Sequence, residues 1–157
     1  MARVSDLKRQ ETIAKIIATA TELFSKNGYH NTQVMDIVRA VGISAGTFYN
    51  YFKDKRDLFE HITRDSFEDL RARIRALRDP LNVWDLNERK LTVVRTYTML
   101  FDYVDRYPEI MLLIFRGGYG VDEAFDLATW SWFSNVAHDL ATDVQGWIDE
   151  GIIAGLN

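Results

Sequence analysis

The chain has 157 residues, of which 47% are hydrophobic and 13% aromatic, enough for one domain or for a small domain joined to a larger helical one. It contains no cysteine, so disulfides and thiolate metal sites are excluded. No apolar run approaches the roughly 20 residues that span a bilayer, and charged residues such as Arg3 and Lys8 interrupt the N-terminal segment. We therefore expect neither a membrane partner nor a signal peptide.

The net charge of −4 conceals an asymmetry between the two halves of the chain. Residues 1–78 carry 14 Lys and Arg against 10 Asp and Glu, a net charge of +4, whereas residues 79–157 carry 5 against 13, a net charge of −8. A basic head on an acidic body suits a DNA-binding domain joined to a separate sensing domain. Charge alone leaves a chance asymmetry equally open.

Each of the first two predicted helices ends at a glycine. Ser5 or Asp6 can cap a first helix, which ends at Asn27-Gly28. Thr32 is a good N-cap for a short second helix. Gly42 can adopt the left-handed conformation that ends such a helix.

A third short helix follows within a few residues, so the pair reads as a helix-turn-helix. Ser44 can cap it, and Phe48 and Phe52, four residues apart, give it one apolar ridge that we expect to be buried. Its remaining surface is small at the start and then offers hydroxyls and an amide, a shape that suits the major groove of DNA. That surface consists of Ala45, Gly46, Thr47, Tyr49, Asn50 and Tyr51. Lys53 and Lys55 then lie where phosphates would pass.

A fourth helix is predicted from Asp54, its cap, to the break at Asp79-Pro80. Its apolar face would consist of Leu58, Phe59, Ile62, Phe67 and Leu70. The arginine-rich end, Arg71 to Arg78, is interpreted as a solvated connector.

Three more helices are predicted in the body of the chain. Asn87 would cap the first, Pro108 suits the first turn of the second, and the last begins at about Asp122. No alternating period of two is present, so the sequence predicts an all-α fold.

The run LFSKNGYHNTQVMDIVRAVGISAGTFYNYFKDKRDLF resembles the DNA-binding domain of the tetracycline-repressor (TetR) family of bacterial transcription regulators. The resemblance extends from Lys8 to about Phe67 and follows a long ordered pattern of Gly-Tyr, a Thr cap, Gly-Ile-Ser and Gly-Thr-Phe-Tyr. One departure is Ala45, where many members carry Lys or a larger polar residue. This departure leaves the operator sequence open.

The resemblance implies a role for each residue of the motif. A phosphate contact is implied for Thr32, through its hydroxyl and the amides of its helix start, and backbone contacts for Tyr49, Tyr51 and Lys55. Base reading would fall to Ala45, Gly46, Thr47 and Asn50, because Ala or a Thr methyl can contact a thymine methyl and Asn can pair with adenine. From the residues themselves, Ser44 is a cap before it is a base reader, although both roles can hold. Lys53 is a DNA-contact candidate for which a plain surface lysine is equally open.

The resemblance also implies a domain organisation. Residues 1–54 would form the helix-turn-helix domain, 55–79 a connecting helix, and 80–157 a helical ligand-binding and dimerisation domain. Members of the family usually continue with two more helices that form the dimer interface. Those helices are absent here, so we expect either a fragment or a chain that pairs through its remaining helices.

The implied function is that of a ligand-responsive repressor in the cytoplasm, which binds a palindromic double-stranded operator as a homodimer and is released by a small hydrophobic or aromatic effector. An aromatic effector pocket is expected to be lined by Tyr97, Phe101, Met111, Phe115, Trp130 and Phe133. We expect no enzymatic activity, cofactor or metal site. The alternative is a helical small-molecule-binding protein or enzyme whose helix-turn-helix is vestigial, which predicts no salt-dependent DNA affinity.

Overall fold

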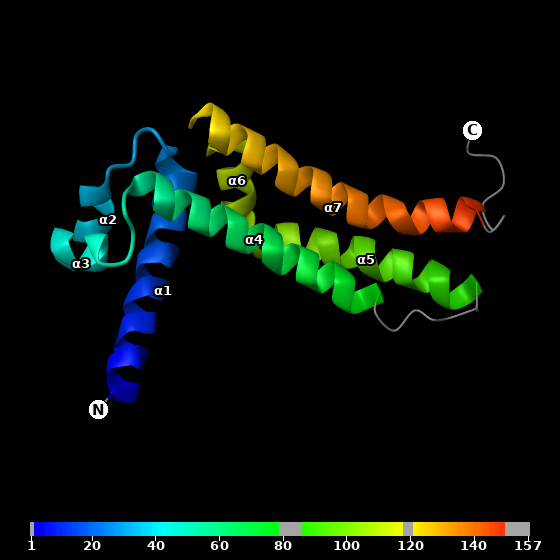
Figure 1. Ribbon diagram of the computed structural model, residues 1–157, viewed down its shortest axis with the longest axis horizontal. Coiled ribbons are helices and arrows are strands. Elements are labelled where there is room, and N and C mark those ends of the chain that lie inside the picture. Colours follow the sequence, from blue (N-terminus) through cyan, green and yellow to red (C-terminus); the bar gives the residue numbers. More distant parts are fainter. Residues whose placement is uncertain (1, 79–85, 118–120, 150–157) are drawn as a thin grey trace. The chain divides into compact units, whose positions relative to one another are not determined.

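The computed structural model describes residues 2–78, 86–117 and 121–149, and within these ranges the chain is helical with no strand, which confirms the all-α fold (Figure 1). None of the helices in these ranges is long and apolar enough to cross a bilayer. The helices in the described ranges are α1 (Ala2–Asn27), α2 (Val34–Val41), α3 (Ala45–Tyr49), α4 (Lys55–Arg78), α5 (Leu86–Arg106), α6 (Pro108–Gly117) and α7 (Glu123–Asp149).

Helix α1 starts earlier than the predicted cap and ends where expected. It begins at Ala2, because no Gly or Pro interrupts the segment before Asp6. At its end, Gly28 adopts φ +83° and donates its N–H to the carbonyl of Phe24 at 2.8 Å. A residue with a Cβ rarely adopts that φ, so glycine fits this helix end.

The cap of α2 is Gln33 and not Thr32, so that prediction was wrong. The Gln33 backbone N–H donates to Asp36 Oδ2 at 2.9 Å, while the Gln33 side chain accepts from the backbone N–H of Asp36. This reciprocal capping box satisfies two N–H groups at once. Thr32 is instead fully buried, and its hydroxyl donates to the carbonyl of Gly28 at 2.9 Å.

The described chain forms two compact units, and α4 and α7 each contribute to both. Unit 1 comprises Met1–Arg64 and Pro108–Leu127, and unit 2 comprises Asp65–Tyr107 and Ala128–Asn157. This division differs from the predicted boundaries at residues 54 and 79. The difference arises because α6 packs against α1, and residues 108–127 thereby join the helix-turn-helix.

The core of unit 1 is aromatic. Phe59 of α4 lies edge-on to Phe24 of α1, with ring centroids 5.3 Å apart, and 5.0 Å from the ring of Phe125 in α7. All three rings are fully buried or nearly so. Burial of a Phe side chain stabilises a fold by about 1.5–3 kcal/mol, so these rings account for much of the cohesion of the unit.

In unit 2 the later part of α4 is packed and paired, so its interpretation as a solvated connector was wrong. Ile74 is fully buried, and Phe67 lies 4.9 Å, centroid to centroid, from the ring of Phe133 in α7. Arg71 donates two hydrogen bonds to Asp139, at 2.8 and 3.3 Å. The predicted apolar face of α4 is confirmed, since its five residues are all buried.

The helix starts of the body follow the prediction in two cases of three. Pro108 is the first residue of α6, as expected. Asp122 caps α7, since its Oδ1 accepts the N–H of Phe125 at 2.8 Å. Asn87 is not a cap, because α5 already begins at Leu86.

Candidate nucleic-acid interface

The turn between α2 and α3 is formed by Gly42, as predicted. Gly42 adopts φ +77°, and its N–H donates to the carbonyls of Val38 and Arg39 at 3.0 and 3.2 Å. The N–H of Ile43 also reaches the Val38 carbonyl, at 3.2 Å. These bonds satisfy the last carbonyls of α2 and let the chain reverse within two residues.

Helix α3 is fixed by one cap and one buried ring. Ser44 Oγ accepts the backbone N–H of Thr47 at 3.0 Å, and the two hydroxyls are hydrogen-bonded at 2.8 Å. Phe48 is fully buried and Phe52 nearly so, which confirms the predicted apolar ridge. The opposite face of this short helix is therefore held towards solvent.

Most of the predicted DNA contacts lie on that face. Ser44, Gly46, Tyr49, Asn50 and Lys53 are exposed, and Ala45, Thr47, Tyr51 and Lys55 are half-buried. Tyr49 is 56% exposed, and its ring lies edge-on to Phe48, with centroids 5.4 Å apart. A ring held on one side by a buried partner and open on the other suits a contact to a DNA backbone.

Neither a close contact nor the backbone conformation in the described residues requires a glycine at position 46. A Cβ built there would meet only Ser44 Oγ, at 3.8 Å, which is ordinary van der Waals contact. Its φ lies outside the left-handed region, so alanine is allowed in the free protein. The absence of a side chain therefore leaves room for a close approach to the backbone at this point.

Thr32 does not occupy the position that the predicted phosphate contact requires. Its side chain is fully buried, and the proton of its hydroxyl is committed to the Gly28 carbonyl. The exposed Gln33 next to it takes the capping position. Sequence reasoning missed Gln33, because glutamine is not among the residues that usually cap a helix.

Lys55 is a structural residue in the first place. Its Nζ donates to the backbone carbonyls of Tyr29 and Thr32, at 2.7 and 2.9 Å, and lies 4.2 Å from the centroid of the Tyr29 ring. Burial lowers the pKa of its ammonium. With two of three donors used, Lys55 ties the loop after α1 to the start of α4, which weakens the predicted phosphate contact.

A cation from α1 joins the surface beside α3. The guanidinium carbon of Arg9 lies 5.8 Å from the centroid of the Tyr51 ring. Arg9 is itself exposed, so its charge remains available to a phosphate while its stem lies beside the ring. It was not among the predicted contacts, because nothing in the sequence links residues 42 positions apart.

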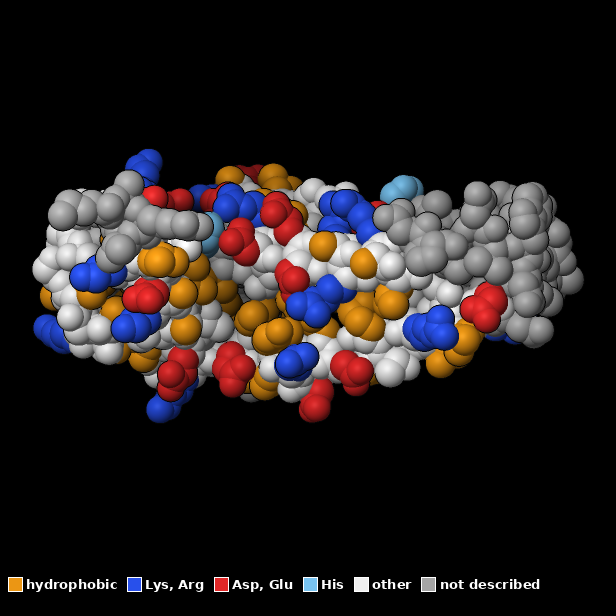
Figure 2. All heavy atoms as spheres, turned by 90° about the horizontal axis from the view of Figure 1, so that it is seen from below, with side chains coloured by type: hydrophobic (Ala, Val, Ile, Leu, Met, Phe, Trp, Pro, Cys, Tyr) orange, Lys and Arg blue, Asp and Glu red, His pale blue; other side chains and the backbone are white. Residues whose placement is uncertain are grey.

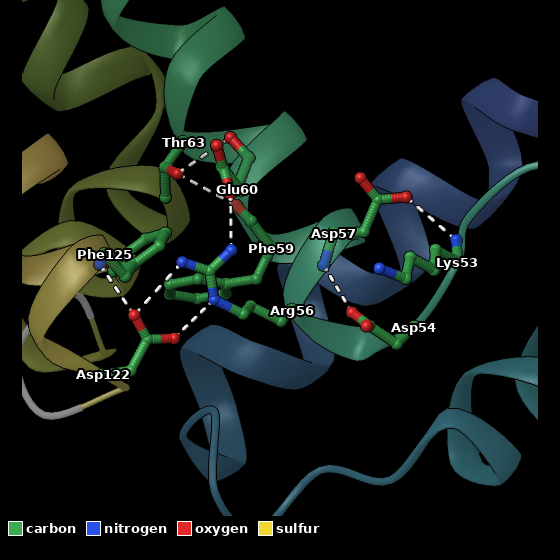
Figure 3. Close-up of polar contacts among 9 residues, drawn as sticks. All are labelled: Lys53, Asp54, Arg56, Asp57, Phe59, Glu60, Thr63, Asp122 and Phe125. Carbon is green, nitrogen blue, oxygen red and sulfur yellow. Dashed lines mark hydrogen bonds and ion pairs between the residues drawn. The ribbon is translucent and has the colours of Figure 1, made fainter.

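The first turn of α4 is tied to the start of α7 by an ion-pair cluster (Figure 3). Arg56 donates to both carboxylate oxygens of Asp122, one at 3.1 Å, and to Glu60 at 2.8 Å. Hydrogen bonding to Arg56 lowers the pKa of Asp122 to about 2, and the Asp122 carboxylate in turn raises the pKa of Arg56. Asp122 also caps α7, so its carboxylate connects α4 with α7.

The residues predicted to line an effector pocket lie in different surroundings. Tyr97, Phe101 and Trp130 are 50%, 73% and 63% exposed. Met111 is half-buried in unit 1, whereas Phe133 packs on Phe67 in unit 2. The side chain of Phe115 lies outside the described residues. Residues 2–78, 86–117 and 121–149 contain no group of three or more His, Asp or Glu that could hold a metal ion.

Residues 16–62 match the family model of bacterial regulatory proteins, tetR family. The chain is 42% identical to the HTH-type transcriptional regulator AcrR of Shigella flexneri over 62 residues, which is 40% of this chain and 29% of that protein. It is 23% identical to IcaR of Staphylococcus aureus, a negative transcriptional regulator of the biofilm operon icaADBC, over 88% of this chain and 70% of the relative.

Among solved structures, FadR from Bacillus subtilis in complex with stearoyl-CoA has the same fold. The TM-score is 0.72 at 19% identity, over 92% of this chain and 75% of that one. The AcrR and IcaR relatives are both named as transcriptional regulators. The chain spans less than a third of the length of the AcrR relative.

Proposed function

We propose that this chain, a member of the TetR family of bacterial regulatory proteins, is a ligand-responsive transcriptional regulator that reads operator DNA with α3. The observation that carries the proposal is the two-sided character of this helix. Phe48 is buried in the core on one side of the helix, while Gly46, Tyr49 and Asn50 are exposed to solvent. A short helix with a small, uncharged tip can enter a major groove about 12 Å wide.

The exposed residues divide between base reading and positioning. Gly46 allows the helix start to approach the base edges, Asn50 supplies an amide that pairs with adenine, and the Thr47 methyl offers an apolar contact to thymine. Tyr49 and Lys53 would contact the phosphate backbone, joined by Arg9 beside Tyr51. Base-reading residues set the sequence preference, whereas the backbone contacts set most of the affinity and its salt dependence.

A dimer on a palindromic operator follows from the geometry of helix-turn-helix readers in general. Two copies of α3 would have to lie about 34–36 Å apart to enter successive major grooves. Repression is the favoured outcome, since IcaR is named a negative regulator. A protein of this kind would act in the cytoplasm, where operator DNA lies.

Release by a small hydrophobic or aromatic effector completes the proposal. FadR of the same fold was solved with stearoyl-CoA, a ligand with a long apolar tail. If an effector weakens DNA binding by a given factor, DNA must weaken effector binding by the same factor, and this reciprocity can be measured.

The test is a matched set of single variants, assayed for DNA selected from a randomised pool. Gly46→Ala should retain or gain helix stability, by up to about 1 kcal/mol, and yet lose DNA affinity. Asn50→Ala should relax sequence preference with little change in salt slope, while Lys53→Ala should flatten that slope by about 1. Asn135→Ala, at an exposed position of α7, is the control. DNA affinity that is unchanged in Gly46→Ala, Asn50→Ala and Lys53→Ala would overturn the proposal.

A further inference from the structure

A hollow of about 350 Å³ lies in unit 2, between the later part of α4 and α5. It contains none of the six residues predicted from the sequence to line an effector pocket. One side is supplied by Arg73 of α4, and the rest by α5 together with Tyr107, which follows it. Its volume falls within the range of about 300–1,000 Å³ that small-molecule sites occupy.

The aromatic end of the hollow is held in place by contacts on both helices. The Tyr103 hydroxyl donates to the backbone carbonyl of Ser66 at 3.1 Å, and its ring is nearly buried. The Tyr107 ring lies 4.8 Å from that of Tyr103, centroid to centroid. Two fixed rings at one end offer an apolar wall that need not reorganise when a ligand binds.

The charges around the hollow are unequally compensated. Arg73 is neutralised by Asp69, with Nε 2.8 Å from Oδ2. Arg95 and Arg106 also line the hollow, are exposed, and form no ion pair within the described part of the chain. Eleven residues of helix separate them, about 16 Å along the axis, so a small rigid ligand reaches only one of them.

Two cations line the aromatic end of the hollow. The guanidinium carbon of Arg73 lies 5.9 Å from the centroid of the Tyr103 ring, but Arg73 is already paired with Asp69, so Arg106 is the cation available to a ligand. It lies three residues after Tyr103 and next to Tyr107, so its guanidinium stands beside the aromatic wall. Asp102, one turn earlier, is the one carboxylate in the lining of the hollow. It forms no ion pair with Arg106 within the described part of the chain. An exposed, unpaired guanidinium beside an apolar wall matches a carboxylate attached to a flat apolar body.

We infer that this hollow binds a small planar organic anion, with the apolar body against Tyr103 and Tyr107 and the carboxylate on Arg106. The inference rests on the proposed response to an effector and names the chemical class of that effector. On the face drawn in Figure 2, hydrophobic side chains lie between charged ones.

The test uses calorimetric titration of the full chain with 2-naphthoate and with its uncharged analogue 2-naphthamide. We expect 2-naphthoate to bind at least about tenfold more tightly, because a charge-assisted hydrogen bond is lost in the amide. Arg106→Gln should weaken 2-naphthoate binding about tenfold or more and leave 2-naphthamide unchanged. Lys90→Gln, which removes one exposed cation from α5 outside the hollow, is the matched control.

A second variant should change the affinity in the opposite direction. Asp102→Asn removes a like charge from the lining, so 2-naphthoate should bind a few-fold more tightly. Equal binding of acid and amide, or equal losses in Arg106→Gln and Lys90→Gln, would overturn the inference.

DNA affinity measured without any ligand separates the two proposals. Its loss in Gly46→Ala and Asn50→Ala depends on the proposed function alone, whereas the calorimetric series depends on the hollow alone. Weakening of DNA binding by 2-naphthoate in the native chain, but not in Arg106→Gln, would support both. An unaltered DNA affinity at saturating 2-naphthoate would overturn its class as the effector.

Discussion

In α3 the ring of Phe48 is buried, whereas in α5 threonines are buried and an aromatic ring is exposed. Thr92 and Thr96 of α5 are nearly buried, while Phe101 is 73% exposed. The two helices therefore place side chains of the same kind in opposite environments. Local signals decide the orientation of a short capped helix, but the covered face of a long helix depends on what packs against it.

The sharpest test of this contrast is the same substitution in both helices. Phe48→Ala should lower the free energy of unfolding by about 3–5 kcal/mol, because it leaves a cavity in the core. Phe101→Ala should change it by less than about 0.5 kcal/mol, as exposed positions do. Urea unfolding of both variants measures the difference, and equal losses would show that the face of α5 bearing Phe101 is covered in solution.

Lys55 should have the next largest effect, and through stability more than through DNA. Lys55→Met leaves the carbonyls of Tyr29 and Thr32 without their donor, which should cost about 1–3 kcal/mol. Lys53→Met, at an exposed lysine two residues earlier, should cost almost nothing. Thermal unfolding compares the stabilities of the two variants. If the salt slope of DNA binding falls by a full unit in Lys55→Met, the predicted phosphate contact of Lys55 is supported.

A smaller gain is expected in α7, where Thr129 is buried. Its hydroxyl has no hydrogen-bond partner among the residues that the structure describes. Thr129→Val removes this unsatisfied group at nearly constant volume, so the free energy of unfolding should rise by about 1 kcal/mol. Thr63→Val is the comparison. The Thr63 hydroxyl donates to the Phe59 carbonyl at 2.9 Å, so this variant should be less stable than the native chain.

The smallest effect should be the pH dependence of the Arg56–Asp122 pair, which is partly exposed and therefore screened. The pKa of Asp122 is depressed to about 2 in the folded chain, against about 3.9 when unfolded. Its contribution is thus present above pH 4 and lost as the pH falls towards 2. Native and Asp122→Asn stabilities should converge across that window, whereas a constant offset would contradict the shift. Glu123→Gln serves as the control.

Much of unit 1 could be predicted because its signals are local. The left-handed Gly42, the Ser44 cap and the buried Phe48 each follow from residue types at fixed spacing. Thr32 was misjudged because a threonine before a helix can donate backwards as readily as it can cap. The hydrogen bonds of Lys55 could not be predicted, because its partners lie 23 and 26 residues away in the sequence.

Unit 2 could be predicted as helical but not as packed. The spacing of Tyr97 and Phe101 is the same whether that face is covered or exposed, so the sequence offers no means of choosing. The hollow beside Tyr103 could not be anticipated either, because it depends on which turn of α4 lies opposite α5.

Three consecutive residues at the start of α4 have three different attachments. Lys55 holds the loop after α1, Arg56 holds Asp122, and Asp57 accepts the backbone N–H of Lys53 at 2.9 Å. For engineering, this means that the helix-turn-helix domain cannot be transferred as a module that ends at residue 54 or 64. A chimera cut at residue 64 would leave Arg56 without its carboxylate and Phe59 without the ring of Phe125. A cut at residue 54 would instead leave the carbonyls of Tyr29 and Thr32 without Lys55. Any transplant should carry residues 108–127 with it.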